Sequence, residues 1–443
     1  MAADTVDVLI VGAGPTGLLL AGDLAAAGVP VTVLERRHGD SETSRACVVH
    51  ARTLELLDAR GIADDLISRG RTVDHFNLFG RIDVDLGRLP SRFGFVLVTP
   101  QYQAERLLAD RARSLGAQII EGMEVNALRA ANEGAHVQAA GAAGKCRTFT
   151  PSFVIGADGA NSTVREMMSL PFLPVQDDEI GETIRKVLGA DLALDAGWLA
   201  RHQGGERRAP RYRSGPVFLA GDAAHLQSPA GGQGVNVGLQ DAANLSWKLA
   251  AIARGTAIPA LLDSYQDERH PSGKAALRLS RNLPALTLFW PLVTRPTTRA
   301  AARPLERASA IADRIAEAVS GIGAGYRGGH GAHRLAGRRA PDLPLTGAGH
   351  HRLYEALREG KFILLDGHRQ HEPVARTASW WRERVLTAVP QAPQAQLSLI
   401  RPDGYVAWAS DVTGEADCGE ALRHELTRWC GTGTASSLAT APR

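Results

Sequence analysis

The 443-residue sequence predicts an α/β fold in which helices cover a parallel sheet. Three observations lead to this fold class. A strand, a helix and a second strand follow one another before residue 36. Two later apolar segments, Phe153–Gly156 and Val217–Ala220, each lead into a pair of Asp and Gly. Further strands and a helix follow the glycine-rich stretch Gly321–Gly331, which predicts a linker before a smaller second α/β unit.

The first unit has the most distinct pattern. Asp7–Val11 and Val31–Leu34 are apolar runs of strand length, and Leu18–Ala26 has the composition of a buried helix. Gly28 directly follows this helix and suits its C-terminal cap. A β-α-β unit of this kind is the building block of a doubly wound sheet, so we expect a Rossmann-type domain here.

The remaining elements follow from apolar periodicity. We expect helices at Thr53–Arg60, Ala104–Leu115, Asp177–Val187, Asp241–Arg254, Leu261–Arg269, Leu305–Val319 and Cys418–Trp429. Short strands are expected at Phe76–Leu78, Asp83–Leu86, Phe95–Val98, Phe362–Leu365 and Gln396–Ile400.

Composition and charge favour a globular enzyme without nucleic-acid or membrane partners. Hydrophobic residues make up 44% and charged residues 22%, and the net charge is only +3 with no basic run. The longest apolar stretches are about ten residues, too short to cross a bilayer. The first residues lack the basic region of a signal peptide, so we expect a cytoplasmic protein. Four widely spaced cysteines (Cys47, Cys146, Cys418 and Cys430) predict free thiols and no metal site.

A glycine motif joins the first strand to the first helix, and it reads Gly12-Ala13-Gly14-Pro15-Thr16-Gly17. Gly12 permits a tight turn, Gly14 lets the main chain approach a pyrophosphate, and Gly17 lets the helix pack on the strand. The helix N-terminus then faces the phosphates. Glu35 ends the second strand, where its carboxylate can accept hydrogen bonds from a ribose, which favours FAD or NAD over NADP.

Two further motifs place acids at strand ends. Asp158 lies in Gly156-Ala157-Asp158-Gly159, which alone could be a turn with a helix cap. Asp222 follows Gly221 after an apolar strand and is placed to bind hydroxyl groups. The following glycine-rich run, Pro229-Ala230-Gly231-Gly232-Gln233-Gly234-Val235-Asn236, enters a helix and offers main-chain N–H groups to an electron-rich ring edge.

Together these segments resemble the group A flavin monooxygenases, the aromatic hydroxylase family, and most of all its aromatic polyketide and phenol hydroxylase branch. The resemblance covers nearly the whole chain and includes Ser44-Arg45-Ala46, His50-Ala51-Arg52-Thr53, Pro100-Gln101 and Glu268-Arg269-His270-Pro271. It implies non-covalent FAD, NAD(P)H as transient reductant, oxygen as co-substrate, and an aromatic small molecule as substrate, as in antibiotic biosynthesis.

The resemblance also implies roles for single residues. Glu35 and Arg36 match adenosine-side contacts, Arg45 and Gln101 match contacts to the ribityl chain and phosphates, and Asp222 matches the ribityl-binding acid. Asp158 matches a residue linked to both FAD and NAD(P)H. The family's flavin-contacting loops match Gly221, Pro229, Gly232, Gly234, Val235 and Asn236. No acid or base for the substrate is evident, and His225 suits a structural role, so the catalytic residues stay unassigned.

The C-terminal segments Gly337-Arg338-Arg339-Ala340-Pro341-Asp342 and Arg401-Pro402-Asp403-Gly404 resemble the thioredoxin-like domain of that branch. No CxxC is present, which argues against a redox role. The predicted organisation is an FAD-binding domain at 1–73, 99–165 and 215–281, a reduced β-sheet substrate region at 74–98 and 166–214, a helical connector at 282–330, a thioredoxin-like α/β domain at 331–431 and a disordered tail at 432–443.

The interval between Arg165 and Gly221 is about half the length that the family would place there. A helix at Asp177–Val187 and a polar segment at Gly204–Gly215 leave too few residues for three or four strands of the usual spacing. Only the strands within Phe76–Val98 are then expected to cover the flavin. Either the site is open, or a homodimer partner or another enzyme covers it, or the sequence has an internal deletion.

The expected consequence of this short interval is uncoupling. Because water enters an uncovered site, the reduced flavin gives peroxide instead of product. Two other functions therefore remain open beside aromatic hydroxylation. One is a flavin oxidase or dehydrogenase acting on a similar substrate. The other is a non-catalytic FAD-binding homologue that assists a partner enzyme.

Overall fold

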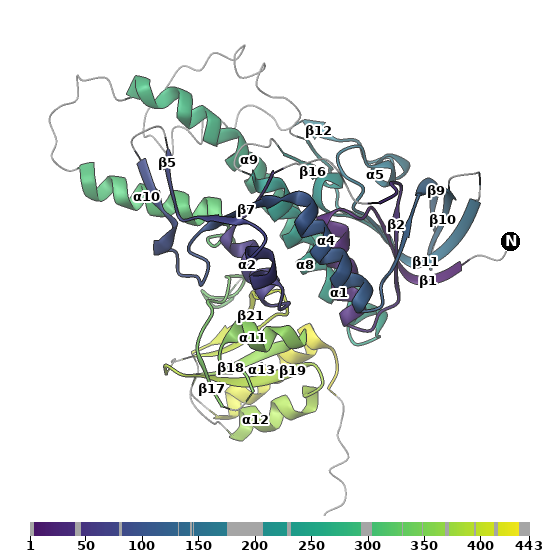
Figure 1. The fold of residues 1–443 in the computed structure, drawn as a ribbon. Coiled ribbons are helices and arrows are strands. Elements are labelled where there is room, and N and C mark those ends of the chain that lie inside the picture. Colours follow the sequence, from purple (N-terminus) through teal and green to yellow (C-terminus); the bar gives the residue numbers. More distant parts are fainter. Residues whose placement is uncertain are drawn as a thin grey trace, which may run out of the picture.

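The structure, a computed structural model, is shown in Figure 1. It describes residues 4–39, 46–78, 82–131, 133–141, 144, 146–174, 207–227, 232–293, 304–329, 331–347, 349–367, 372–393, 396–411 and 415–433. The predicted helix at Asp177–Val187, the beginning of the polar segment at Gly204–Gly215 and the predicted tail from residue 434 onward lie outside these residues.

A parallel sheet forms the centre of the larger part of the molecule. Its strands run in the order β14-β15-β11-β1-β2-β8. β1 (Asp4–Val11) pairs in parallel with β2 (Val31–Glu35) on one side and with β11 (Cys146–Gly156) on the other. β8 (Gln118–Glu121) and β15 (Val217–Leu219) extend the parallel pairing outward, and the two-residue β14 (Arg213–Ser214) adds an antiparallel edge. The predicted Rossmann-type α/β fold is confirmed.

Three helices pack together against this sheet: α1 (Pro15–Ala26), α4 (Gln101–Ser114) and α8 (Gln233–Ala253). α1 consists almost entirely of Leu, Ala and Gly, and eight of its twelve residues are buried. Such a helix has no polar face and is stable only inside the fold. It lies between α4 and α8, and this packing fixes the position of the helix that begins at the glycine motif.

An antiparallel extension of the sheet was not predicted. β9 (Met123–Ala131) pairs with β10 (Gly134–Gly141), and β10 pairs with the first half of β11. β9 buries Met123 and Val125 on one face while its other residues are partly or fully exposed. These strands are rich in Ala, Gly and polar residues, so their sequences lack the β-branched signal that favours strands.

Short strands surround the region above the sheet. β3 (Ala46–Val49), β7 (Val96–Pro100) and β4 (Arg71–Val73) form one sheet, while β5 (His75–Leu78) and β6 (Ile82–Asp85) form a hairpin. The three strands predicted between residues 76 and 98 are thus confirmed within one or two residues at each end.

The middle region also contains strands that were not predicted, while the expectation that only Phe76–Val98 covers the flavin stays a prediction. β12 (Leu173–Pro174), β13 (Arg207–Arg208) and β16 (His225–Leu226) form another sheet of two-residue strands. Strands this short carry no periodicity that a sequence could reveal. Their pairing brings Pro174 next to Arg207, so the two ends of the intervening segment lie together.

Of two further helices, one is much longer than predicted and the other agrees with the prediction. α9 (Asp263–Val293) continues far beyond Arg269, although Pro271 lacks the N–H that a helix interior needs. Tertiary packing outweighs this cost, because Tyr265, Arg269 and Leu277 are all buried. α10 (Pro304–Ser320) agrees with the predicted helix and packs against β6, as Figure 1 shows.

The C-terminal unit is a separate five-stranded sheet of thioredoxin-like order, β17-β19-β18-β20-β21. β18 (Phe362–Asp366) and β19 (Val385–Pro390) are parallel, whereas β17 (Leu345–Thr346), β20 (Leu397–Ile400) and β21 (Val406–Ser410) are antiparallel to their neighbours. The helices of this unit are α11 (Leu353–Ala356), α12 (Glu372–Ala378) and α13 (Glu415–Cys430). The predicted fold class is confirmed here as well, while the domain boundaries stay a prediction.

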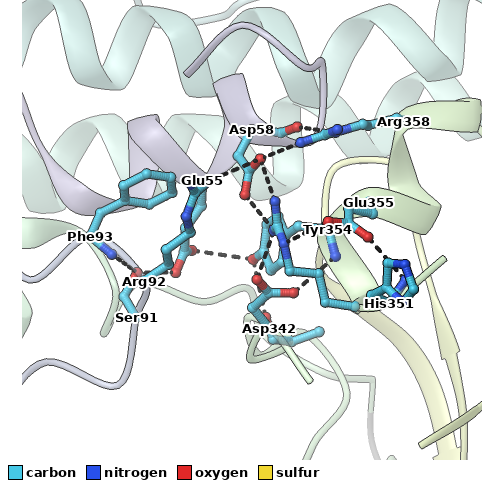
Figure 2. A network of polar contacts seen from close by, with 12 residues as sticks. Glu55, Asp58, Ser91, Arg92, Phe93, Asp342, His351, Tyr354, Glu355 and Arg358 are labelled. Atoms are coloured by element: carbon cyan, nitrogen blue, oxygen red, sulfur yellow. Dashed lines mark hydrogen bonds and ion pairs between the residues drawn. The ribbon is translucent and has the colours of Figure 1, made fainter. Parts of the chain in front are cut away.

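The two units meet through buried charges on α2 (Ala51–Asp58). Arg52 is fully buried and donates to Glu55 Oε2 at 3.0 Å, to the Tyr354 hydroxyl at 2.7 Å and to the Asp403 carbonyl at 2.6 Å. Figure 2 shows Asp58 facing Arg358, whose Nη2 lies 2.8 Å from Asp58 Oδ1. Segments about 300 residues apart in sequence are thus joined by ion pairs in which the Asp58 carboxylate is buried.

A second set of buried charges joins α8, α9 and the C-terminal unit. Arg401 donates to Glu268 Oε1 at 2.6 Å and Oε2 at 2.9 Å, and Lys248 donates to Glu268 Oε2 at 2.9 Å. Burial acts to raise the pKa of Glu268, but Arg401 and Lys248 outweigh it and hold this pKa well below its usual value. Burial lowers the pKa of Lys248 to about 8, against the opposing effect of Glu268.

Candidate cofactor site

A cavity of about 450 Å³ lies at the carboxyl ends of β1, β2 and β11, where parallel sheets bind ligands. Most of the predicted residues line it: Gly12, Gly14, Pro15, Thr16, Glu35, Arg36, Gln101, Asp158, Asp222, Gly234 and Val235. These residues come from positions up to 223 apart in the sequence. The fold therefore gathers all three motifs around one space.

The three glycines of the first motif have different structural roles. Gly12 has φ +105°, and a Cβ there would lie 2.4 Å from the Ala157 carbonyl oxygen. A Cβ at Gly17 would lie 2.1 Å from the Gly12 carbonyl oxygen, so both positions are closed by main chain. A Cβ at Gly14 would meet nothing within 4 Å. Gly14 instead borders open space in the cavity, as a main chain that approaches a pyrophosphate must.

Glu35 is held at the end of β2 by three hydrogen bonds. Its Oε2 accepts from Ala13 N at 2.8 Å, and its Oε1 accepts from Arg37 N at 3.0 Å and Arg37 Nε at 2.8 Å. Burial acts to raise the pKa of Glu35, yet these bonds outweigh it and lower the pKa. The carboxylate therefore stays ionised, with lone pairs left for a further donor. The main-chain N–H of Ala13 therefore contributes to the site indirectly, by fixing the Glu35 carboxylate.

Asp158 combines the two interpretations that its motif allowed. Its Oδ1 accepts from Ser162 Oγ at 2.6 Å and its Oδ2 from Val164 N at 3.1 Å, so it supports the start of α5 (Thr163–Met167). It also lines the cavity, and burial raises its pKa. A capping acid at this edge holds the N-terminal end of α5 toward the cavity.

Gly221 and Asp222 form the loop on the opposite side of the cavity. Gly221 has φ +62°, and a Cβ there would lie 2.7 Å from Thr16 Oγ1. Gly221 N donates to Asp241 Oδ2 at 3.0 Å. Asp241 is fully buried, and it also accepts from Arg269 Nε and His225 Nε2, both at 2.6 Å. This buried carboxylate fixes the loop that presents Asp222 to the cavity.

His225 has the structural role that its sequence context suggested. It is fully buried, and its Nε2 is used by Asp241. Burial acts to raise the pKa of Asp241, but Arg269 and His225 outweigh it and keep this pKa low. The imidazole therefore holds the carboxylate rather than a substrate.

The start of α8 differs from prediction. The helix begins at Gln233, earlier than the predicted Asp241–Arg254, and Gly232 precedes it with φ +63°. Asn236 Nδ2 donates to the carbonyls of Val48 and Gly232, each at 2.7 Å, and its Oδ1 accepts from His50 N at 2.8 Å. The Asn236 side chain thus ties the helix start to β3. Gly234 and Val235, the two residues directly before Asn236, are the residues that reach the cavity.

Some predicted residues do not line the cavity, and others that do were missed. Ala13, Gly17, Gly221, Gly232 and Asn236 support its walls, while Arg45 and Pro229 lie outside the described residues. The missed lining residues include Arg37, Glu105, Met123, Glu124, Val125, Asn161 and Thr163. The alternation in Met123-Glu124-Val125 could have revealed β9, whereas Glu105 gave no signal.

The shape and chemistry of the cavity fit a dinucleotide. It has an acid at the end of β2, open space above Gly14 and the starts of two helices facing inward. Asp222 adds another carboxylate to the lining. Within the described residues, no cluster of His, Cys, Asp and Glu could hold a metal ion, and no described helix is long and apolar enough to cross a membrane. Fold and site together define a dinucleotide-binding oxidoreductase.

Comparison with known families specifies this class. The family described as FAD binding domain matches residues 5–182 and 173–280, and the family described as aromatic-ring hydroxylase, C-terminal, matches residues 333–433. The chain therefore belongs to the FAD-dependent aromatic-ring hydroxylases, which are monooxygenases, and FAD is its cofactor. The FAD-domain match is divided at residues 173–182, where the short interval begins.

Three similar proteins illustrate the family. An uncharacterized aromatic compound monooxygenase of Bacillus subtilis is 33% identical over 96% of this chain and 98% of its own length. The dialkyldecalin synthase of Streptomyces rugosporus is 32% identical over 96% and 98%. The solved structure of an anhydrotetracycline hydroxylase from Streptomyces rimosus has a TM-score of 0.80 at 29% identity and covers 97% of this chain and 100% of its own. The first alignment spans 494 positions, more than the 443 residues here, so it contains gaps in this chain.

Proposed function

We propose that this protein hydroxylates an aromatic polyketide or phenolic small molecule, with non-covalently bound FAD, NAD(P)H as reductant and oxygen as co-substrate. The observation that carries the proposal is the single cavity that brings together Gly14, Glu35, Asp158 and Asp222. Membership in the aromatic-ring hydroxylases and likeness to an anhydrotetracycline hydroxylase support the choice of reaction and substrate class.

Each residue is assigned a role from its position in the cavity. Glu35 receives the ribose hydroxyls, because its ionised carboxylate is fixed by Ala13 and Arg37. The main chain around Gly14 and the start of α1 hold the pyrophosphate. Asp222 receives the ribityl hydroxyls. When bound, FAD supplies the redox chemistry that passes electrons from NAD(P)H to oxygen.

The main chain at the start of α8 orients the reactive ring. Gly234 and Val235 line the cavity in the first turn of this helix, where N–H groups have no partner within the helix. Asn236 holds that turn against β3 through Val48 and His50. These donors stabilise negative charge on the ring edge, because the positive end of the helix points there.

The short interval after Pro174 affects how well the fold can exclude water from the reaction at the flavin. In the described part of this region, β12 and β13 contribute two residues each. We infer that cover for the reaction comes from outside this small sheet, for instance from a homodimer or a partner enzyme in the cytoplasm. The isolated chain should then return most electrons from NAD(P)H as hydrogen peroxide.

The proposal is tested by steady-state oxidation of NADH and NADPH by the FAD-loaded chain, with and without candidate aromatics. We expect NAD(P)H consumption to rise with a true substrate and an oxygenated product to form. Peroxide is measured in parallel, because it separates uncoupled turnover from hydroxylation. Absence of flavin reduction under any condition would contradict hydroxylation.

A second function is favoured by one specific observation. The relative named dialkyldecalin synthase is nearly as similar as the hydroxylases and covers almost the whole chain. A family member can therefore carry a name that denotes ring formation rather than oxygen insertion. The same assay distinguishes this case, because conversion of a substrate without NAD(P)H consumption indicates a non-oxidative reaction.

A further inference from the structure

A second cavity, of about 290 Å³, lies between the FAD-binding part and the C-terminal unit. It shares no lining residue with the cofactor cavity. α1, α8, β18 and α13 all contribute to its walls. Its volume is close to the lower end of the range for small-molecule sites, and such sites often lie between domains. A molecule of one or two rings would fit.

The cavity has an excess of positive charge. Three of its lining side chains are acidic, and six are basic: Arg60, Arg111, Arg254, Arg358, Lys361 and Arg384. Arg60 and Arg111 share one carboxylate, Asp23, at 2.5 Å and 3.1 Å, and all three side chains are at most 14% exposed. Two guanidinium groups with one carboxylate leave a net positive charge in a setting that is largely closed to water.

Two further guanidinium groups are bound only by main-chain oxygens in the described part of the chain. Arg384 donates to the carbonyls of Cys430, Thr432 and Thr256. Arg254 donates to the Ala27 carbonyl at 3.3 Å. Carbonyl groups satisfy N–H donors but do not neutralise the charge, so both side chains can still pair with an anion.

Aromatic side chains form another part of the cavity wall. Trp247 packs edge-on against Phe362 with centroids 5.4 Å apart and lies 6.4 Å from Trp429, and all three residues line the cavity. Trp247 Nε1 is buried without a hydrogen-bond partner among the described residues.

We propose that this interdomain cavity is a second binding site, for a planar aromatic anion with a carboxylate, phenolate or sulfonate group. The ring packs on the wall formed by Trp247, Phe362 and Trp429, and the anionic group pairs with Arg254 and Arg384. A non-aromatic anion would leave the apolar wall uncovered, and a neutral aromatic would leave the positive charge unpaired. The proposal does not depend on turnover at the FAD site.

Bound ligand would also hold the two units together. The cavity walls come from both units, so a ligand that needs the docked arrangement stabilises it in proportion to its occupancy. α8 supplies Ser246 and Trp247 to this cavity and Gly234 to the cofactor cavity. A ligand in the second site therefore contacts α8, the same helix whose first turn lines the cofactor cavity.

The test is a titration of the FAD-loaded full chain with 2-naphthoate, followed by tryptophan fluorescence and thermal unfolding. We expect saturable binding that weakens with added salt and raises the melting temperature. 2-Naphthalenemethanol, a neutral analogue, and inorganic phosphate, a non-aromatic anion, should each bind at least about tenfold more weakly. Equal affinity for the neutral analogue, or no saturable binding of naphthoate, overturns the proposal.

Variants locate the bound anion. Arg384→Gln and the exposed Arg254→Gln should each weaken naphthoate binding several-fold, while FAD content and the flavin absorption spectrum stay the same. Arg213→Gln is the matched control, because Arg213 lies outside this cavity and pairs with Asp263. Arg254→Gln tests the site even if Arg384→Gln fails to fold. Unchanged affinity in Arg254→Gln, or a naphthoate-induced shift of the flavin spectrum that both variants retain, places the anion elsewhere and overturns the proposal.

Discussion

The cofactor cavity and the interface between the two units are built by opposite means. At the cavity, main-chain geometry dominates, with Gly12 and Gly17 closed by neighbouring main chain and Gly14 bordering open space. At the interface, charged side chains dominate, and Arg52 and Arg401 are among the largest fully buried side chains of the chain's described part. The cofactor cavity leaves space for a ligand, whereas the interface fills its space and fixes the two units relative to each other.

The difference explains why the two regions tolerate change differently. A buried ion pair is costly to break, because removing one partner leaves the other charge without solvent or a counterion. A glycine that borders open space can accept a side chain without loss of folding, although the ligand is then displaced. Substitutions should therefore separate cofactor binding from stability.

The largest effect is expected from Gly17→Val. The Cβ would lie 2.1 Å from the Gly12 carbonyl oxygen, and neither the strand nor the helix can move away inside the core. We expect a loss of more than about 4 kcal/mol in the free energy of unfolding, and little folded protein. Circular dichroism and the yield of monodisperse protein check this. A Gly17→Val protein that melts like the wild type would refute the assigned close contact.

The interface should be nearly as sensitive. Glu268→Gln removes the carboxylate that pairs with Arg401 and Lys248 and leaves both cations buried. Breaking such a pair costs about 3–5 kcal/mol in unfolding free energy. Denaturant unfolding measures the loss, and FAD affinity of the folded fraction should stay close to that of the wild type. A large loss of FAD affinity without loss of stability would show that the two regions are not separate.

A smaller effect is expected at the cavity from Asp222→Ala. This change removes a charge-assisted hydrogen bond to the ribityl chain, typically about 1.5–3 kcal/mol. The apo-protein should unfold at nearly the same denaturant concentration as the wild type, because Asp222 is exposed to the cavity. FAD titration by flavin fluorescence checks the affinity. Asp222→Asn serves as the conservative control and should retain part of it.

The smallest effect is expected in the stability of the protein at acidic pH. The pKa of Glu268 is lower in the folded state than in the unfolded chain, so its contribution is complete above about pH 4.5 and is lost as pH falls. The wild type should lose up to about 1.4 kcal/mol of stability per pH unit from this group below that value. Glu268→Gln should lack this part of the slope. Identical slopes for both proteins between pH 5 and 3 would contradict the role of Glu268.

The same contrast governs what the sequence could predict. The glycine motif, Glu35 and the Gly221-Asp222 pair were recognisable, because a main-chain turn constrains residue types at fixed spacing. Arg52, Asp342 and Arg401 were noticed only as parts of motifs without a role. Their partners lie far away in sequence, and no local pattern specifies a pair such as Arg52 with Tyr354. The antiparallel strands β9 and β10 were missed for a third reason, since Ala-rich strands have weak propensity.

The central claim is that the 450 Å³ cavity holds FAD without a covalent bond and that Gly14 borders the pyrophosphate. One paired measurement tests it, FAD titration of the apo-forms of the wild type and Gly14→Val, with thermal unfolding of both. We predict that wild-type protein binds FAD and releases it on denaturation. Gly14→Val should melt within about 3 °C of the wild type as apo-protein, because its Cβ enters open space, yet bind FAD at least about tenfold more weakly. Wild-type protein that takes up no FAD, or full FAD affinity in Gly14→Val, would contradict the account.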